Sequence, residues 1–185
     1  MNPANSDHLT ITVFGGSAPQ EGSPGYEEAR QVGRLLAQAG FVVMNGGYMG
    51  TMEAVSRGAR EAGGHTIGIT SNGFDWRGIQ ANRWIAHEEK APDLLSRLRL
   101  LTQADGFLAL KGSLGTLTEI SLTWSLIQIR AIPAAPFVLL GPHWQRILQA
   151  FAADSYVCPE DLALLQVADT PEQAVSLLQQ GVRRR

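Results

Sequence analysis

The sequence is poor in cysteine and lysine, and it has no long hydrophobic run. Cys158 is the only cysteine, which excludes an internal disulfide and a zinc site built on cysteines. The two lysines, Lys90 and Lys111, are the only candidates for a Schiff-base mechanism. No apolar stretch approaches the roughly 18 residues of a membrane span, and residues 1–10 lack a signal-peptide pattern. We therefore expect a cytoplasmic protein with no membrane partner.

An excess of positive charge is also missing. The formal net charge is −2, so no overall field attracts a nucleic-acid backbone. The four histidines form no H-x-x-x-H pattern, and we expect neither a metal nor a cofactor. The 185 residues, 44% of them apolar, predict a single domain over residues 1–185, with 1–8 and 181–185 as frayed tails.

Strand-like and helix-like patterns alternate along the chain. Short apolar runs predict strands at Leu9–Phe14, Phe41–Met44, His65–Ile69, Arg83–Ala86, Asp105–Leu110, Pro136–Leu140 and Leu164–Val167. Helical spacing of apolar residues predicts helices at Pro24–Ala39, Thr51–Ala62, Pro92–Thr102, Thr116–Arg130, His143–Ala153 and Pro171–Gln180. This alternation predicts an α/β fold, a Rossmann-like three-layer sandwich with a mostly parallel sheet flanked by helices.

Three glycine turns each follow a predicted strand and precede a helix, at Gly15–Ser17, Gly46–Gly50 and Gly112–Thr116. In a parallel sheet such turns meet at the carboxyl edge, where backbone N–H groups and helix N-termini bind anions. None of them is a Walker loop, and Gly46–Gly50 lacks the G-x-G-x-x-G spacing of dinucleotide sites. The turns favour a mononucleotide or sugar phosphate, although any single turn is also explained by tight packing alone.

The turn sequences resemble those of a known family. Gly46–Met52 followed by Ala62–Gly64 resembles the GGGxxGLM … AGG signature of the LOG family, the cytokinin riboside 5′-monophosphate phosphoribohydrolases once named lysine decarboxylases. Phe14–Ser17 resembles the family's F-C-G-S, and Leu110–Glu119 resembles its P-G-G-x-G-T-x-x-E motif. The resemblance implies a Rossmann-like homodimer that cleaves the N-glycosidic bond of a nucleoside 5′-monophosphate, such as AMP or a cytokinin riboside monophosphate. The products are a free base and ribose 5-phosphate.

The same resemblance implies catalytic roles for Glu119 and Arg97, the motif glutamate and the upstream arginine. A carboxylate beside the sugar stabilises the positive charge that builds up as a ribosyl–base bond breaks. Thr116 and Glu119 also fit an S/T-x-x-E capping box at a helix start, which leaves a structural alternative open.

Arg97 has a structural alternative as well. The family's adjacent Arg-Lys pair is Ser96-Arg97 here, so the arginine is shifted by one residue, a rotation of about 100° on a helix. Arg97 is then either a site residue or a solvated helix arginine, with Arg99 or Arg83 as possible substitutes. Lysine-based decarboxylation is disfavoured because neither lysine has a convincing cofactor context.

Phosphate and ribose contacts are expected from residues of the three turns, namely Ser17, Gly46, Gly47, Gly50, Thr51, Gly112, Ser113, Gly115 and Thr116. This chain departs from the family pattern at Asn45, Lys111 and Ser113, which replace the first glycine of GGG, a proline and a glycine. Ser113 keeps its backbone N–H, so anion binding survives if its φ stays negative. Trp76 and Trp84 are candidates for stacking on a base or for ordinary packing.

Two further classes of function stay open beside the hydrolase. One is a nucleotide-binding or sensing protein of the same fold that has lost catalysis, and the other is a transferase with the same oxocarbenium chemistry.

The helix predicted at Thr116–Arg130 is apolar around much of its circumference. Such a helix needs a second partner, and we expect a homodimer.

Overall fold

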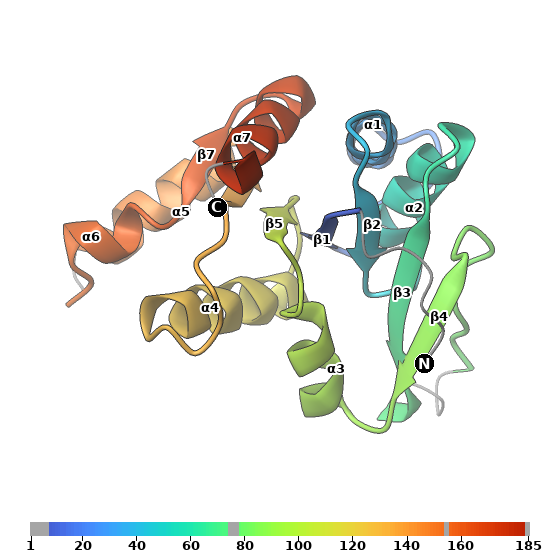
Figure 1. Cartoon of the computed structure of the whole chain (residues 1–185), viewed down its shortest axis with the longest axis horizontal. Helices are drawn as coiled ribbons and strands as arrows, with labels where there is room; N and C mark the ends of the chain where they lie inside the picture. The colour runs from blue at the N-terminus through green and yellow to red at the C-terminus, as the bar shows by residue number, and fades with distance from the viewer. Residues whose placement is uncertain (1–7, 74–77, 154–155, 184–185) are drawn as a thin grey trace.

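The structure, a computed structural model, describes residues 8–73, 78–153 and 156–183. Its centre is a seven-stranded sheet in the order β4-β3-β2-β1-β5-β6-β7, in which every pair of neighbours is parallel (Figure 1). The strands are β1 (Thr10–Phe14), β2 (Val42–Asn45), β3 (Thr66–Ser71), β4 (His87–Ala91), β5 (Gly106–Ala109), β6 (Phe137–Leu140) and β7 (Gln166–Ala168). The predicted α/β class and parallel sheet are confirmed.

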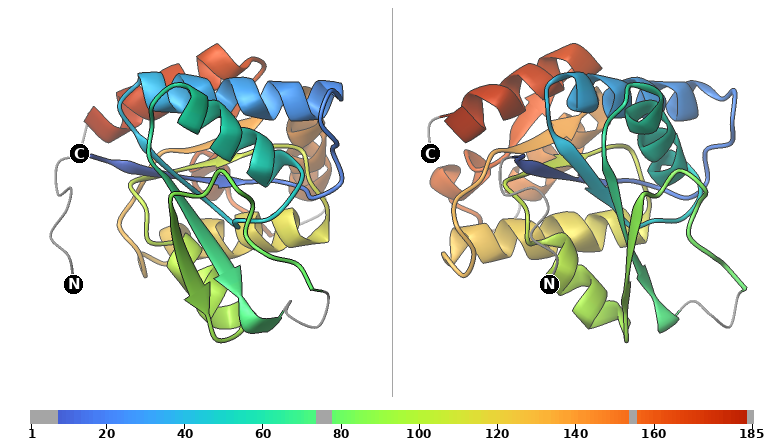
Figure 2. Two further views of the ribbon diagram at one scale, coloured as in Figure 1. Left: turned by 90° about the vertical axis from the view of Figure 1, so that its right-hand side faces the viewer. Right: turned by 45° about the vertical axis from the view of Figure 1, so that its right-hand side comes forward.

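Helices cover both faces of the sheet and form the outer layers. They are α1 (Pro24–Gln38), α2 (Thr51–Glu61), α3 (Leu94–Leu101), α4 (Leu114–Gln128), α5 (Pro142–Ala153), α6 (Pro159–Leu162) and α7 (Pro171–Arg183). Residues of α1, α2 and α7 pack on one face, and residues of α3, α4 and α5 pack on the other (Figure 2). The predicted three-layer architecture is therefore confirmed. Within the described ranges, none of the helices is long and apolar enough to cross a membrane.

The two cores follow from the alternation of side chains along each strand. On β1, Ile11 and Val13 face the core beneath α1 and α7, whereas Phe14 faces the opposite core. There Phe14 meets Phe107 and Phe137, with ring centroids 5.5 to 6.0 Å apart. Because both faces are buried, these strands are continuous apolar runs, which is why the sequence pattern identified them.

The order of the strands determines where a ligand site can form. From β1 the chain adds β2, β3 and β4 in one direction and then returns to place β5 on the other side of β1. The loops after β1 and β5 therefore diverge, which leaves a crevice at the carboxyl edge of the sheet. The glycine turns after β1, β2 and β5 all lie at this edge.

Several predicted boundaries are wrong. The strand expected at Arg83–Ala86 lies at His87–Ala91 instead, where β4 forms the edge of the sheet and is exposed over four of its five residues. Because an edge strand has only one neighbouring strand, it often carries charged side chains. No apolar run in the sequence therefore marks the position of β4. The helix expected from Thr116 begins at Leu114, and α7 continues to Arg183, beyond its predicted end at Gln180.

Candidate functional site

A cavity of about 220 Å³ lies at the switch point, and all three glycine turns contribute to it. Its lining residues are Gly15, Gly16, Ser17, Tyr48, Met49, Met52, Ile79, Arg97, Ser113, Gly115, Thr116 and Glu119. A neighbouring cavity of about 490 Å³ shares Gly16, Ser17 and Ser113 with it. The predicted convergence of the turns is what the structure shows. Sequence reasoning missed Tyr48, Met49, Met52 and Ile79 as lining residues, because apolar side chains beside a glycine turn carry no chemical signal.

Close packing between the first two turns accounts for several of the glycines. The backbone N–H and the hydroxyl of Thr51 both donate to the carbonyl of Gly16, at 2.9 and 3.0 Å. A Cβ on Gly15 would lie 2.1 Å from Thr51 Oγ1, and a Cβ on Gly50, whose φ is +74°, would lie 2.6 Å from Ser17 Cα. Thr51 thus joins the two turns, and its contact with an anion stays a prediction.

Asn45 stabilises the second turn in place of a glycine. Its Oδ1 accepts a hydrogen bond from the N–H of Gly47 at 2.8 Å, and its Nδ2 donates to Ser56 Oγ at 2.8 Å. Asn82, from the segment after β3, donates to the carbonyls of Gly47 and Tyr48 at 3.0 and 2.8 Å. Asn45 therefore supplies side-chain hydrogen bonds that the family's glycine, which has no side chain, cannot make.

Arg97 points into the site rather than into solvent. It is 6% exposed, and its Nε donates to the Ile69 carbonyl at 2.7 Å while its Nη2 donates to the Gly46 carbonyl at 3.3 Å. Its guanidinium carbon lies 5.6 Å from the centre of the Tyr48 ring. A Cβ on Gly46 would lie 1.9 Å from Arg97 Nη2, so the glycine makes room for the arginine. The solvated-arginine alternative is wrong.

The two substitute arginines lie elsewhere. Arg99 is exposed on α3. Arg83 packs over the Trp84 ring at 5.0 Å from its centroid, and Arg57 lies over the same ring at 5.5 Å. Neither Trp84 nor these arginines line the cavity, so Trp84 serves packing. Trp76 lies outside the described residues.

Glu119 lies opposite Arg97 on α4. It is 8% exposed, and its Oε1 is 3.5 Å from Arg97 Nη1. Burial raises the pKa of Glu119 to about 7, and the positive charge and hydrogen bond of Arg97 oppose that rise. The carboxylate therefore titrates near neutral pH, which is a common property of groups that exchange protons with a substrate.

The capping-box alternative for Thr116 and Glu119 is wrong. The N-cap of α4 is Ser113, so Thr116 and Glu119 both lie inside the helix. Ser113 makes no side-chain capping bond, and its φ is −117°, which a serine adopts without strain. Both Ser113 and Gly115 therefore present backbone N–H groups of the first helical turn near the cavity, where a helix N-terminus favours an anion.

Thr116 has an unsatisfied hydroxyl. The side chain is 2% exposed, and its Oγ1 has no hydrogen-bond partner among the described residues. A Cβ on Gly112 would lie 2.0 Å from this Oγ1, so Gly112 provides the space that the hydroxyl occupies. A buried hydroxyl without a partner costs about 1–3 kcal/mol. Since Thr116 lines the cavity, a bound oxygen acceptor would remove that cost.

The fold and the crevice define an α/β protein of the Rossmann-like class with a cavity at its topological switch point, where ligands bind in proteins of this class. Within the described residues, no group of three or more His, Cys, Asp or Glu side chains is arranged to hold a metal ion. The chain belongs to the SLOG cluster4 family, whose model matches residues 8–131. The LOG resemblance is therefore confirmed.

Named relatives agree with this assignment, and a solved structure shares the fold. The chain is 32% identical to a rice protein named as a probable cytokinin riboside 5′-monophosphate phosphoribohydrolase, over 93% of this chain and 72% of that protein. It is 26% identical to the protein of that name from Rhodococcoides fascians, over 91% and 88% of the two chains. The molybdenum cofactor binding protein of Rippkaea orientalis superposes with a TM-score of 0.73 at 24% identity, over 95% and 98% of the chains, which shows a shared fold.

Proposed function

We propose that this chain hydrolyses the N-glycosidic bond of a nucleoside 5′-monophosphate, either AMP or a cytokinin riboside monophosphate. The observation that carries the proposal is the buried pair of Arg97 and Glu119, which lines one cavity with the unpartnered hydroxyl of Thr116. The names of the curated relatives support the same reaction. No cofactor is needed for it.

In the proposed complex the phosphate binds at the N-terminus of α4. The N–H groups of Ser113 and Gly115 and the hydroxyl of Thr116 supply donors from one side, and the turn that contains Gly16 and Ser17 supplies them from the other. This places the ribose near Glu119, since all of these residues line the same cavity.

Glu119 then supplies the chemistry. The C1′–N bond breaks with its electron pair going to the base, and the ionised carboxylate stabilises the positive charge on the ribose. A water molecule bonds to C1′ through its oxygen, and its second proton passes through Glu119 to the departing base. Arg97 acts as a positioning residue, because its guanidinium orients the Glu119 carboxylate and favours the charged form.

Release of free base tests the proposal. Purified protein incubated with AMP should release adenine and ribose 5-phosphate, whereas adenosine, which lacks the phosphate, should not be cleaved. Tight binding of AMP without any release of adenine would contradict the hydrolase and support the second candidate, a nucleotide-binding protein without catalysis. Lys111 and Ser113 stand where the family motif has a proline and a glycine, and this departure is the observation that favours the second candidate.

We also propose that the functional unit is a homodimer that forms through α4. One side of this helix buries Glu119, Ile120 and Ile127. Leu114 and Leu117, one turn apart on the helix, are 78% and 44% exposed, and Ile129 directly after its end is 63% exposed. An apolar face of this kind is typical of an interface. A molecular mass of 20.0 kDa, that of one chain, in light scattering at micromolar concentration would contradict the dimer.

A further inference from the structure

Another cavity, of about 510 Å³, lies beside the candidate site on the side of β3 and β4. Its lining residues are Tyr48, Thr70, Gly78, Ile79, Gln80, Ala81, Glu88 and Lys90. Tyr48 and Ile79 also line the cavity that holds Arg97 and Glu119, so the two spaces share a wall. A nucleotide whose phosphate lies at the N-terminus of α4 can therefore extend into the cavity beside β3 and β4.

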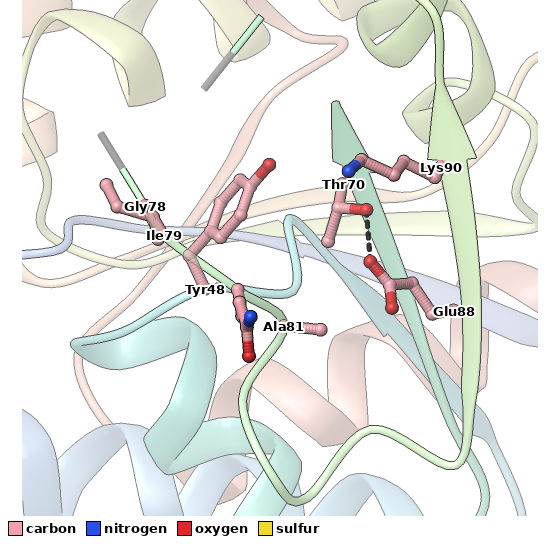
Figure 3. Close-up of a pocket in the computed structure, with 8 residues that line it drawn as sticks. Tyr48, Thr70, Gly78, Ile79, Ala81, Glu88 and Lys90 are labelled. Carbon is pink, nitrogen blue, oxygen red and sulfur yellow. Dashed lines mark hydrogen bonds between the residues drawn. The ribbon is translucent and has the colours of Figure 1, made fainter. Parts of the chain in front are cut away.

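The wall of this cavity that β3 and β4 form is polar, and it carries one negatively and one positively charged side chain. Thr70 pairs in register with Lys90, and Glu88 lies two residues before Lys90, so all three side chains point to the same face of the sheet. Figure 3 shows them reaching from the two paired strands toward Tyr48. Thr70 Oγ1 donates to Glu88 Oε1 at 2.5 Å, which orients the carboxylate.

Glu88 and Lys90 offer complementary hydrogen bonds within two residues of one strand. A carboxylate accepts hydrogen bonds, and an ammonium group donates them. An unsubstituted amino group next to a ring nitrogen, as on adenine or cytosine, presents the matching donor and acceptor. A long alkyl substituent on that amino group replaces one of its two N–H donors and would remove water from both charges without forming a hydrogen bond itself, which is costly.

We infer that this cavity receives the base, and that Glu88 and Lys90 select an unsubstituted amino-bearing base over one that carries an isoprenoid chain. The inference rests on the proposed function and narrows its substrate class, from AMP or a cytokinin riboside monophosphate to the unmodified nucleotide. Tyr48 supplies an aromatic wall between the two cavities, on which a flat base can stack.

The experiment measures dissociation constants by calorimetry for AMP, N6-isopentenyl-AMP and ribose 5-phosphate. The wild type should bind AMP about tenfold more tightly than the isopentenyl nucleotide, which corresponds to about 1.4 kcal/mol. Glu88→Gln and Lys90→Met should each reduce this preference at least threefold and leave the affinity for ribose 5-phosphate unchanged. Glu89→Gln is the matched control, because Glu89 points to the opposite face of the same strand.

The possible outcomes separate this inference from the proposed function. Equal or tighter binding of the isopentenyl nucleotide overturns the inference, and so does a preference that Glu88→Gln and Lys90→Met alter no more than Glu89→Gln does. Selective binding of AMP without cleavage supports the base pocket while overturning the hydrolase. Failure of both AMP and ribose 5-phosphate to bind overturns both.

Discussion

Arg97 Nη1 lies 3.5 Å from Glu119 Oε1, and both residues are buried, at 6% and 8% exposed. The two residues come from helices on either side of β5 in the chain, and they meet at the carboxyl edge of the sheet. Removing two charges from water is expensive unless they are paired, and a pair of this kind adds little stability. Its position in a cavity therefore favours a functional role over a structural one.

Replacing Glu119 with glutamine should abolish most of the activity. The amide oxygen can still accept a hydrogen bond from Arg97, but it carries no negative charge to stabilise the ribose cation. We expect kcat for AMP to fall by about 10²- to 10⁴-fold. Release of adenine measures the loss, and Glu89→Gln is the control for a general effect of removing a glutamate. Near-normal activity of Glu119→Gln would contradict the proposed role of this carboxylate.

The rate should depend on pH through Glu119. The proposed chemistry needs the carboxylate in its charged form, and the pKa of Glu119 is raised to about 7 by burial. We therefore expect kcat/KM for AMP to increase as pH rises from about 5 to 8, with its midpoint near the pKa of this group. A profile that is flat across this range would show that Glu119 is not the group that titrates.

Protein stability should respond to pH in the opposite direction. Because the folded-state pKa of Glu119 lies above its ordinary value of 4.5, the folded state binds more protons between these two values. The stabilisation is fully present below the unfolded pKa and is lost as pH rises through about 7. Urea denaturation at several pH values should show this loss in the wild type and a smaller one in Glu119→Gln.

A methyl group at Gly46 should displace Arg97. The added Cβ would lie 1.9 Å from Arg97 Nη2 and 2.8 Å from Met52 Sδ. We expect Gly46→Ala to destabilise the fold by about 1–3 kcal/mol and to reduce the rate at least tenfold. Gly25→Ala is the matched control, since its Cβ would meet only ordinary contacts, with the nearest atom 3.7 Å away.

Thr116→Val should separate binding from stability. Valine has the shape of threonine without the unpartnered hydroxyl, so the variant should be as stable as the wild type or up to about 1 kcal/mol more stable. Its affinity for ribose 5-phosphate should fall about tenfold, as measured by calorimetry. Thr123 also has a buried unpartnered hydroxyl on α4 but does not line the cavity, which makes Thr123→Val the control. Equal affinities of the two variants would show that Thr116 is not a ligand.

Local sequence signals were sufficient for the elements that position the site. The predicted start of the helix at Pro24 is correct, because proline is favoured at the first helical position and Ser23 Oγ, at the N-cap, accepts a hydrogen bond from the N–H of Tyr26. The strand that precedes it was identifiable because both of its faces are buried. The edge strand β4 was misplaced, since its charged residues follow no apolar pattern.

Only the folded chain decided between the structural alternatives for Glu119 and Arg97. The pattern Thr-x-x-Glu describes a capping box as well as a site residue, and only the observed start of α4 at Leu114 excludes the cap. The shift of Arg97 by one residue suggested rotation away from the family's position. Its Nε bond to Ile69 and its Nη2 bond to Gly46 show that the long side chain still reaches the crevice.

The sequence by itself determined the class of fold, the family and the three glycine turns, because these depend on periodicity and on short motifs read along the chain. Tertiary structure alone decided which side chains share a cavity. Strand order brings the turns after β1 and β5 together at the switch point, although their first glycines, Gly15 and Gly112, are 97 residues apart in the chain. It also decided that Glu119 is buried beside Arg97, and burial is the physical cause of a carboxylate that titrates near neutral pH.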